Sequence, residues 1–134
     1  MQLHRLARVL FLAAVPFAFA ACGDEDEGTG PDGSSGGDAI PTLSSGLTPS
    51  ISWSGANARN ITLVEMQNGQ PVNSYVWSVT STNPSVGFPS PVAYGEVPSG
   101  SAQLAPAAAL KAGTTYRVTL ALVDGKGGFR DVTR

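Results

Sequence analysis

The chain has 134 residues, a formal net charge of −2, one cysteine and one histidine. A single cysteine excludes an internal disulfide. Because His4 and Cys22 both lie close to the N-terminus, the remainder of the chain lacks the side chains that Ser–His or Cys–His nucleophile pairs and His-based metal sites require.

Residues 1–21 have the layout of a signal peptide. Arg5 and Arg8 make the start positive, and residues 9–20 form an uncharged, apolar run. A membrane-spanning helix needs roughly 20 apolar residues, and this run is well short of that length. The segment is therefore predicted to be a secretory signal that is removed.

The end of this segment, Phe19-Ala20-Ala21-Cys22, resembles the lipobox of bacterial lipoproteins, with Phe19 where that family usually has Leu. The resemblance implies cleavage between Ala21 and Cys22, and attachment of diacylglycerol and further fatty acid such as palmitate to Cys22. Two alternatives remain. Ala18-Phe19-Ala20 fits the A-x-A site of ordinary signal peptidase, which would release a secreted, non-lipidated chain, and the segment could also stay as an uncleaved anchor.

A lipoprotein cysteine carries several acyl chains, and two or more hold a protein stably on a membrane. The expected partner is therefore the membrane itself, reached through the N-terminal lipid. Gly23 follows the cysteine in place of the aspartate typical of inner-membrane retention, which favours the outer membrane of the cell envelope. The acidic stretch 24–27 resembles a surface-export signal of some bacterial lipoproteins.

Residues 22–39 are rich in glycine, serine and acidic residues and contain no large apolar side chain. Such a segment cannot bury enough surface to offset its ordering entropy, so we expect a disordered tether after the lipid. The remaining residues, 40–134, have the size of one domain. That domain carries six basic and four acidic side chains, and this balance predicts no nucleic-acid partner.

Apolar and polar residues alternate along most of the domain, which predicts an all-β fold. Ile51 and Trp53 should share one face of their strand, as should Tyr75, Trp77 and Val79, while Asn68-Gly69 predicts a hairpin turn. A helical turn is possible only at 105–112. Eight short pieces are expected to form a small β-sandwich of about seven strands: 42–43, 50–54, 60–66, 72–79, 91–97, 101–104, 115–123 and 129–133.

Two motifs resemble the fibronectin type III family. Thr48-Pro49-Ser50-Ile51-Ser52-Trp53 is similar to its opening, where a proline precedes a strand whose tryptophan enters the core. The segment 110–118 is similar to its E-to-F corner, with Ala112 in place of a common proline. The resemblance implies a fibronectin type III-like sandwich and a tyrosine corner at Tyr116, whose hydroxyl bonds to backbone upstream.

The domain offers no catalytic, metal or cofactor site by pattern, so we expect a protein that is not an enzyme. An enzyme would need clustered carboxylates among Glu65, Glu96, Asp124 and Asp131. The leading hypothesis is a non-catalytic module that binds an envelope protein or glycan, or has a structural role.

Four aromatic residues are the candidate binding residues: Tyr75, Trp77, Phe88 and Tyr94. Exposed rings on a β-sheet face can stack on sugars or anchor a protein. An alternative function is therefore carbohydrate binding by Tyr75 and Trp77, which requires Trp77 to be accessible to solvent. The competing interpretation places both rings in the core with Trp53 and Tyr116.

Overall fold

The computed structural model describes residues 35–46 and 48–134. This part of the chain contains no helix and forms nine strands. In chain order they are β1 (Ser35–Gly37), β2 (Thr42–Leu43), β3 (Ser50–Ser52), β4 (Ala58–Gln67), β5 (Gln70–Ser81), β6 (Val92–Ala93), β7 (Ser101–Ala105), β8 (Thr115–Leu122) and β9 (Gly127–Thr133).

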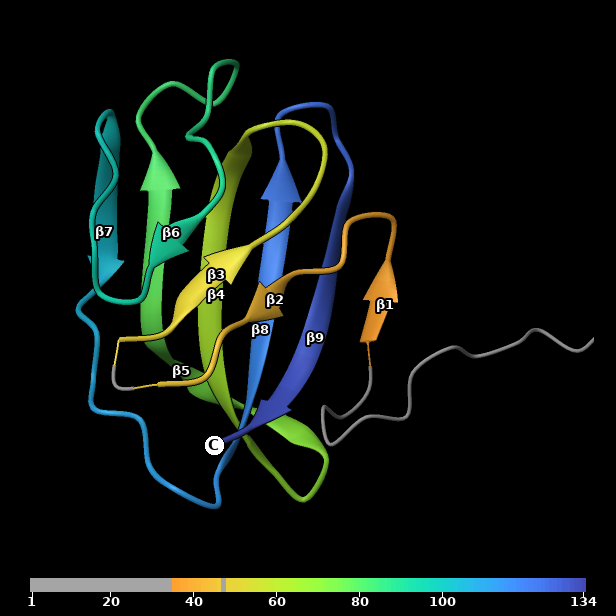
Figure 1. Ribbon diagram of the computed structural model, residues 1–134, viewed down its shortest axis with the longest axis vertical. Helices are drawn as coiled ribbons and strands as arrows, with labels where there is room; N and C mark the ends of the chain where they lie inside the picture. Colours follow the sequence, from red (N-terminus) through yellow and green to blue (C-terminus); the bar gives the residue numbers. More distant parts are fainter. Residues whose placement is uncertain (1–34, 47) are drawn as a thin grey trace, which may run out of the picture.

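The strands form two antiparallel sheets, and the smaller sheet lies across one face of the larger (Figure 1). The larger sheet has the order β1-β9-β8-β4-β5-β7, and the smaller has the order β2-β3-β6. This arrangement confirms the predicted small all-β sandwich. The strand number differs from the prediction chiefly because β1 adds to one edge of the larger sheet.

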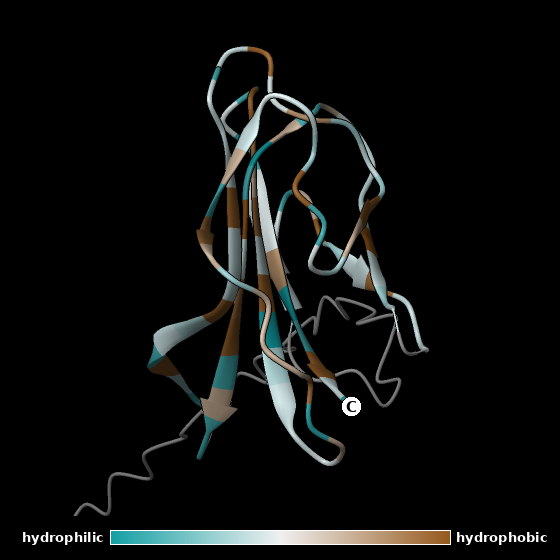
Figure 2. Ribbon diagram, turned by 90° about the vertical axis from the view of Figure 1, so that its left-hand side faces the viewer, coloured by the Kyte–Doolittle hydropathy of each residue, from teal (hydrophilic) through white to brown (hydrophobic). Residues whose placement is uncertain are grey.

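The core lies between the two sheets and follows the alternation of the sequence. Along β8 the buried residues are Tyr116, Val118, Leu120 and Leu122, all on one face. Figure 2 shows the same alternation as changes of hydropathy along neighbouring strands. Burial of each large apolar side chain stabilises the fold by about 1.5–3 kcal/mol, and the other strands contribute Ile51, Ile61, Leu63, Trp77, Val79, Val92 and Val132.

The hairpin between β4 and β5 turns at Asn68 and Gly69, as the sequence predicts. Both residues have positive φ, 52° and 75°, which is the requirement of a type I′ turn. Gln67 pairs with Gln70 on either side of the turn. The longest two strands of the domain are therefore joined by the tightest kind of hairpin.

The predicted common face of Tyr75, Trp77 and Val79 is wrong. Trp77 pairs with Leu63 on β4, whereas Tyr75 pairs with Val64, so two steps on β5 match a single step on β4. This β-bulge at Val76 reverses the alternation of the strand. Trp77 and Val79 are completely buried, and Tyr75 is turned outward with 59 % of its surface exposed.

The first strand in the described residues, β1, lies inside the segment 22–39 that the sequence predicts to be a tether. β1 pairs with β9 through Gly36 opposite Phe129 and Gly37 opposite Gly128. Ala39, which follows β1, is buried in the core. The contribution of β1 is backbone pairing, which leaves no hydrophobic pattern in the sequence.

The possible helical turn at 105–112 does not form. The segment that joins β7 to β8 instead crosses the open end of the sandwich, and Ala108 N–H donates to Val76 O at 3.0 Å. Pro106, near its start, has no N–H to give to a helix. This segment forms one wall of a cleft of about 470 Å³.

Candidate functional site

The expected lipid attachment residue Cys22 and the cleavage position between Ala21 and Cys22 lie outside the described residues. The site residues that the structure does place are the aromatic side chains of the domain. They divide into three groups: buried rings, two tyrosines that hydrogen-bond to the segment at the open end of the sandwich, and an outward-facing row on the larger sheet.

Two tyrosine hydroxyls hold the segment between β7 and β8. Tyr116 Oη accepts a hydrogen bond from Lys111 N–H at 2.8 Å, which is the backbone contact expected of a tyrosine corner. Tyr94 Oη donates to Ala108 O at 2.6 Å. Together the two phenols fix a stretch of chain that has no regular backbone pairing of its own.

Tyr94 is half-buried and serves the fold. Its ring meets Trp77 edge to face, with the centroids 5.3 Å apart. Burial raises the pKa of Tyr94 from 10.0 to about 12, with a further upward contribution from the neighbouring Tyr116. Its phenol is therefore a neutral hydrogen-bond donor throughout the physiological pH range.

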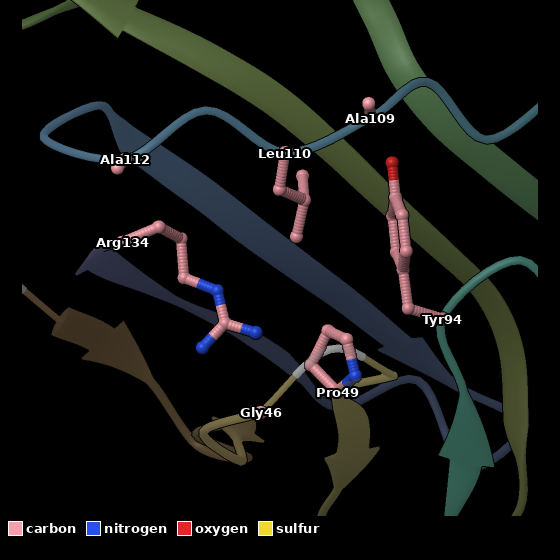
Figure 3. A pocket seen from close by; sticks show the side chains of 7 residues that line it. All are labelled: Gly46, Pro49, Tyr94, Ala109, Leu110, Ala112 and Arg134. Atoms are coloured by element: carbon pink, nitrogen blue, oxygen red, sulfur yellow. The ribbon is translucent and has the colours of Figure 1, made fainter.

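A cleft of about 470 Å³ opens beside Tyr94, between the β7–β8 segment and the loop that leads into β3. Figure 3 shows Tyr94 at one end and Arg134 at the other, with Leu110 and Pro49 between them. Arg134 Nη1 donates to Ser44 O at 2.9 Å, which links the cleft wall to the β2–β3 loop. The cleft can accept a small apolar group, and the guanidinium would favour an anion at its end.

Trp77 and Phe88 do not form a binding surface. Trp77 is fully buried, and only 1 % of Phe88 is exposed. Phe88 makes a backbone bridge with Ala58 and packs edge to face on Trp53, with centroids 6.3 Å apart. The hypothesis of a sugar platform that contains Trp77 is therefore wrong, because the bulge at Val76 leaves only Tyr75 outside.

Tyr75 belongs to a row that crosses four neighbouring strands on the outer face of the larger sheet. Val64 pairs with Tyr75 on one side and with Arg117 on the other, and Arg117 pairs with Asp131. The Arg117 guanidinium lies 4.2 Å above the ring centroid of Phe129. Two of its nitrogens donate to the two carboxylate oxygens of Asp131, at 2.6 and 2.8 Å.

The neighbouring row of the same face consists mainly of small side chains that carry hydroxyl groups. Thr62 pairs with Ser78 and with Thr119, and Thr119 pairs with Phe129. These two rows define what we call the outer row face. Sequence reasoning missed Arg117 and Phe129 as members of a site, although the β8–β9 hairpin register would have placed them together.

A hollow of about 170 Å³ adjoins Tyr75 and is lined by Val72, Asn73 and Ser74. These three residues have no partner on β4, because the register passes directly from Tyr75 opposite Val64 to Pro71 opposite Met66. The irregular strand thus leaves an amide and a hydroxyl beside an exposed phenol ring.

The four carboxylates that an enzyme would need lie in different elements. Glu65 on β4 is 3.5 Å from Lys111 Nζ, and Asp131 on β9 is bound to Arg117. Asp124 accepts a hydrogen bond from Lys126 N–H in the β8–β9 turn. Glu96 lines a separate small hollow among prolines after β6.

No three His, Cys, Asp or Glu side chains in the described ranges gather closely enough to hold a metal ion. Across the same residues there is no helix with the length and apolar character needed to cross a membrane.

Comparison of the chain with protein-family models, with curated proteins and with solved structures finds no match.

Proposed function

We propose that the protein is a lipid-anchored component of the bacterial cell envelope, held in the outer membrane by acyl chains on Cys22. Its β-sandwich is a non-catalytic binding or structural module. The observation that carries this proposal is the sequence Phe19-Ala20-Ala21-Cys22 after a charged start and a short apolar run.

The composition of the domain supports a role without catalysis. Residues 35–134 contain neither histidine nor cysteine, which removes the thiol nucleophile and the commonest general base. The surface features that remain suit recognition: the cleft beside Tyr94 and the exposed ring of Tyr75. Ser35, the first residue of β1, follows Cys22 by thirteen positions, which gives the domain reach away from a membrane surface.

Metabolic labelling with an alkyne fatty acid tests the anchor. The native chain should take up label and enter the detergent-rich phase of a Triton X-114 extraction, whereas Cys22→Ser should do neither. A Cys22→Ser, Ser34→Cys double variant is the matched control, since a thiol placed outside the motif should stay unlabelled. A native chain without label, beginning at Ala21 by mass spectrometry, would establish ordinary secretion instead.

A further inference from the structure

We propose that Asn68, at the tip of the hairpin between β4 and β5, is a site of spontaneous deamidation. The Gly69 backbone nitrogen displaces ammonia from the Asn68 side chain, and the product is aspartate or isoaspartate. The reaction needs no ligand beyond water. It is therefore independent of acylation at Cys22 and of any partner of the domain.

The chemistry is a ring closure followed by hydrolysis. The Gly69 nitrogen gives its proton to water or hydroxide and bonds to the Asn68 side-chain carbonyl carbon, from which ammonia leaves. Water then opens the cyclic imide. Breaking the new C–N bond gives aspartate, whereas breaking the original peptide bond gives isoaspartate, in which the main chain runs through the former side chain. Asparagine and water become an acid and ammonia, with nothing oxidised or reduced.

The first argument is the open space around the attacking nitrogen. Asn68 and Gly69 are both exposed. A Cβ placed on Gly69 would have no atom within 4 Å, so neither a side chain of its own nor a neighbour hinders the approach of the Asn68 carbonyl carbon.

The second argument is that most other asparagines of the chain are held in place. Asn57 and Asn60 donate side-chain hydrogen bonds to Val86 O and Val79 O, at 2.9 and 3.1 Å. Asn83 accepts one from Ser85 N–H, and the residue after it is a proline, which has no N–H to lose.

Within the described residues, only Asn68 and Asn73 have side-chain amides without a hydrogen bond to the protein. Asn73 is followed by Ser74, whose side chain crowds the attacking nitrogen, whereas Asn68 is followed by glycine. The structure therefore separates one asparagine from the other four.

The third argument is that the turn can open locally. Ring closure requires rotation about the Asn68 Cα–C bond, which a closed turn restricts. Only the pairs Gln67–Gln70 and Met66–Pro71 lie between the turn and the stretch 72–74, which has no partner on β4. Neighbouring antiparallel pairs alternate between bonded and non-bonded, so a single hydrogen-bonded pair holds the tip. Such a short end opens without unfolding of the core.

Isoaspartate should change the end of the larger sheet that carries Tyr75. It lengthens the main chain within a two-residue turn whose geometry depends on positive φ at both positions, and it adds a negative charge. We therefore expect the Gln67–Gln70 pair to separate, while the buried part of the hairpin stays paired.

The test is peptide mapping by mass spectrometry of the full chain, purified in detergent and aged in mildly alkaline buffer. We expect Asn68 to convert at least about tenfold faster than Asn73, its matched control on the same hairpin. The product should elute as two peaks of equal mass, aspartate and isoaspartate. Amide hydrogen exchange at 66–71 should be faster in the isoaspartate form than in Asn68→Asp, which carries the charge without the longer main chain.

A deletion of Asn73 and Ser74 tests the opening step. It would place Val72 opposite Glu65 and keep Tyr75 opposite Val64, which makes the ladder continuous. Conversion of Asn68 should be slower in this variant than in the native chain. Equal rates at Asn68 and Asn73, faster conversion at a hydrogen-bonded asparagine, or an unchanged Asn68 rate in the deletion variant would overturn the proposal.

Discussion

At the scale of single residues, the two phenols at the open end of the sandwich have structural roles, and the role of Tyr94 depends on its proton. Tyr94 can donate to Ala108 O only while it is protonated, and its Oη–O distance of 2.6 Å is short for such a bond. Tyr116 accepts from Lys111 N–H and packs fully inside the core. The β7–β8 segment therefore depends on side-chain hydrogen bonds where strands depend on backbone pairing.

Stability should consequently fall in alkaline solution because of Tyr94. Its pKa is about 12 in the folded protein and 10.0 without the surrounding structure, so the folded state favours the neutral phenol. This contribution is complete below pH 10 and is lost as the pH rises from 10 to 12. Urea unfolding followed by tryptophan fluorescence at several pH values measures it.

Tyr94→Phe should lose about 1 kcal/mol at pH 8, because it lacks the hydrogen bond, but should show a flatter pH dependence than the native protein. The two stability curves should therefore approach each other above pH 10. Tyr75→Phe, on the exposed ring, is the control and should follow the native curve. Parallel curves for Tyr94→Phe and the native protein would show that this phenol does not titrate as argued.

At the scale of strands, the alternation of apolar residues was enough to predict β4, β5 and β8 and the hairpin between the first two. It did not predict β1, because Ser35-Gly36-Gly37 has the composition of a linker. Pairing of glycine backbone with β9 depends on a distant strand and leaves no local pattern. Local composition indicates how much apolar side-chain surface a segment can bury. The side chains of β1 bury almost none, so its composition does not reveal the strand.

The candidate site was predicted only in part for a related reason. A β-bulge moves every residue beyond it to the opposite face of the strand, and the sequence around Val76 contains no signal that predicts one. Tyr75 was therefore identified as a candidate with the wrong companion. Arg117 and Phe129 join it through pairings across β4, β8 and β9, which are long-range in the sequence.

The docking of β1 should depend on the lack of a side chain at Gly128. A Cβ placed there would lie 2.3 Å from Ala39 O and 2.8 Å from Gly36 O, both rigid backbone atoms. Gly128→Ala should therefore push β1 and the residues after it away from β9. The expected result is faster amide hydrogen exchange at 35–39 and a loss of about 1–3 kcal/mol in unfolding free energy.

Gly36→Ala provides the graded comparison for this prediction. Its added Cβ would meet the Phe129 ring edge at 2.9 Å, and a side chain can move where backbone cannot. The loss should therefore be smaller than for Gly128→Ala. If the two variants exchange at the same rate as the native protein over 35–39, close approach at Gly128 is not what positions β1.

At the scale of the whole molecule, the sandwich has a larger sheet whose β9 side is closed by a very short strand. β1 occupies the edge of β9, and Asp38 and Ala39 N–H groups donate to Gly127 O at 2.9 and 3.3 Å. An uncovered edge strand presents unpaired backbone groups that can pair with another chain. Residues 35–39 therefore protect the edge of β9 as well as extend the sheet.

A domain that begins at residue 40, the boundary suggested by composition, should be less stable than one that begins at residue 33. It loses the β1 pairing, the two hydrogen bonds to Gly127 and the buried methyl group of Ala39, which together correspond to about 2 kcal/mol. Urea unfolding should show this difference, and size-exclusion chromatography with light scattering should show concentration-dependent association of the shorter chain only. Equal stability and a monomeric shorter chain would mean that the edge of β9 needs no cover. In that case residues 40–134 would account for the full unfolding free energy of the sandwich. The pairing at Ser35–Gly37 would then form on a stable sandwich without adding to its stability.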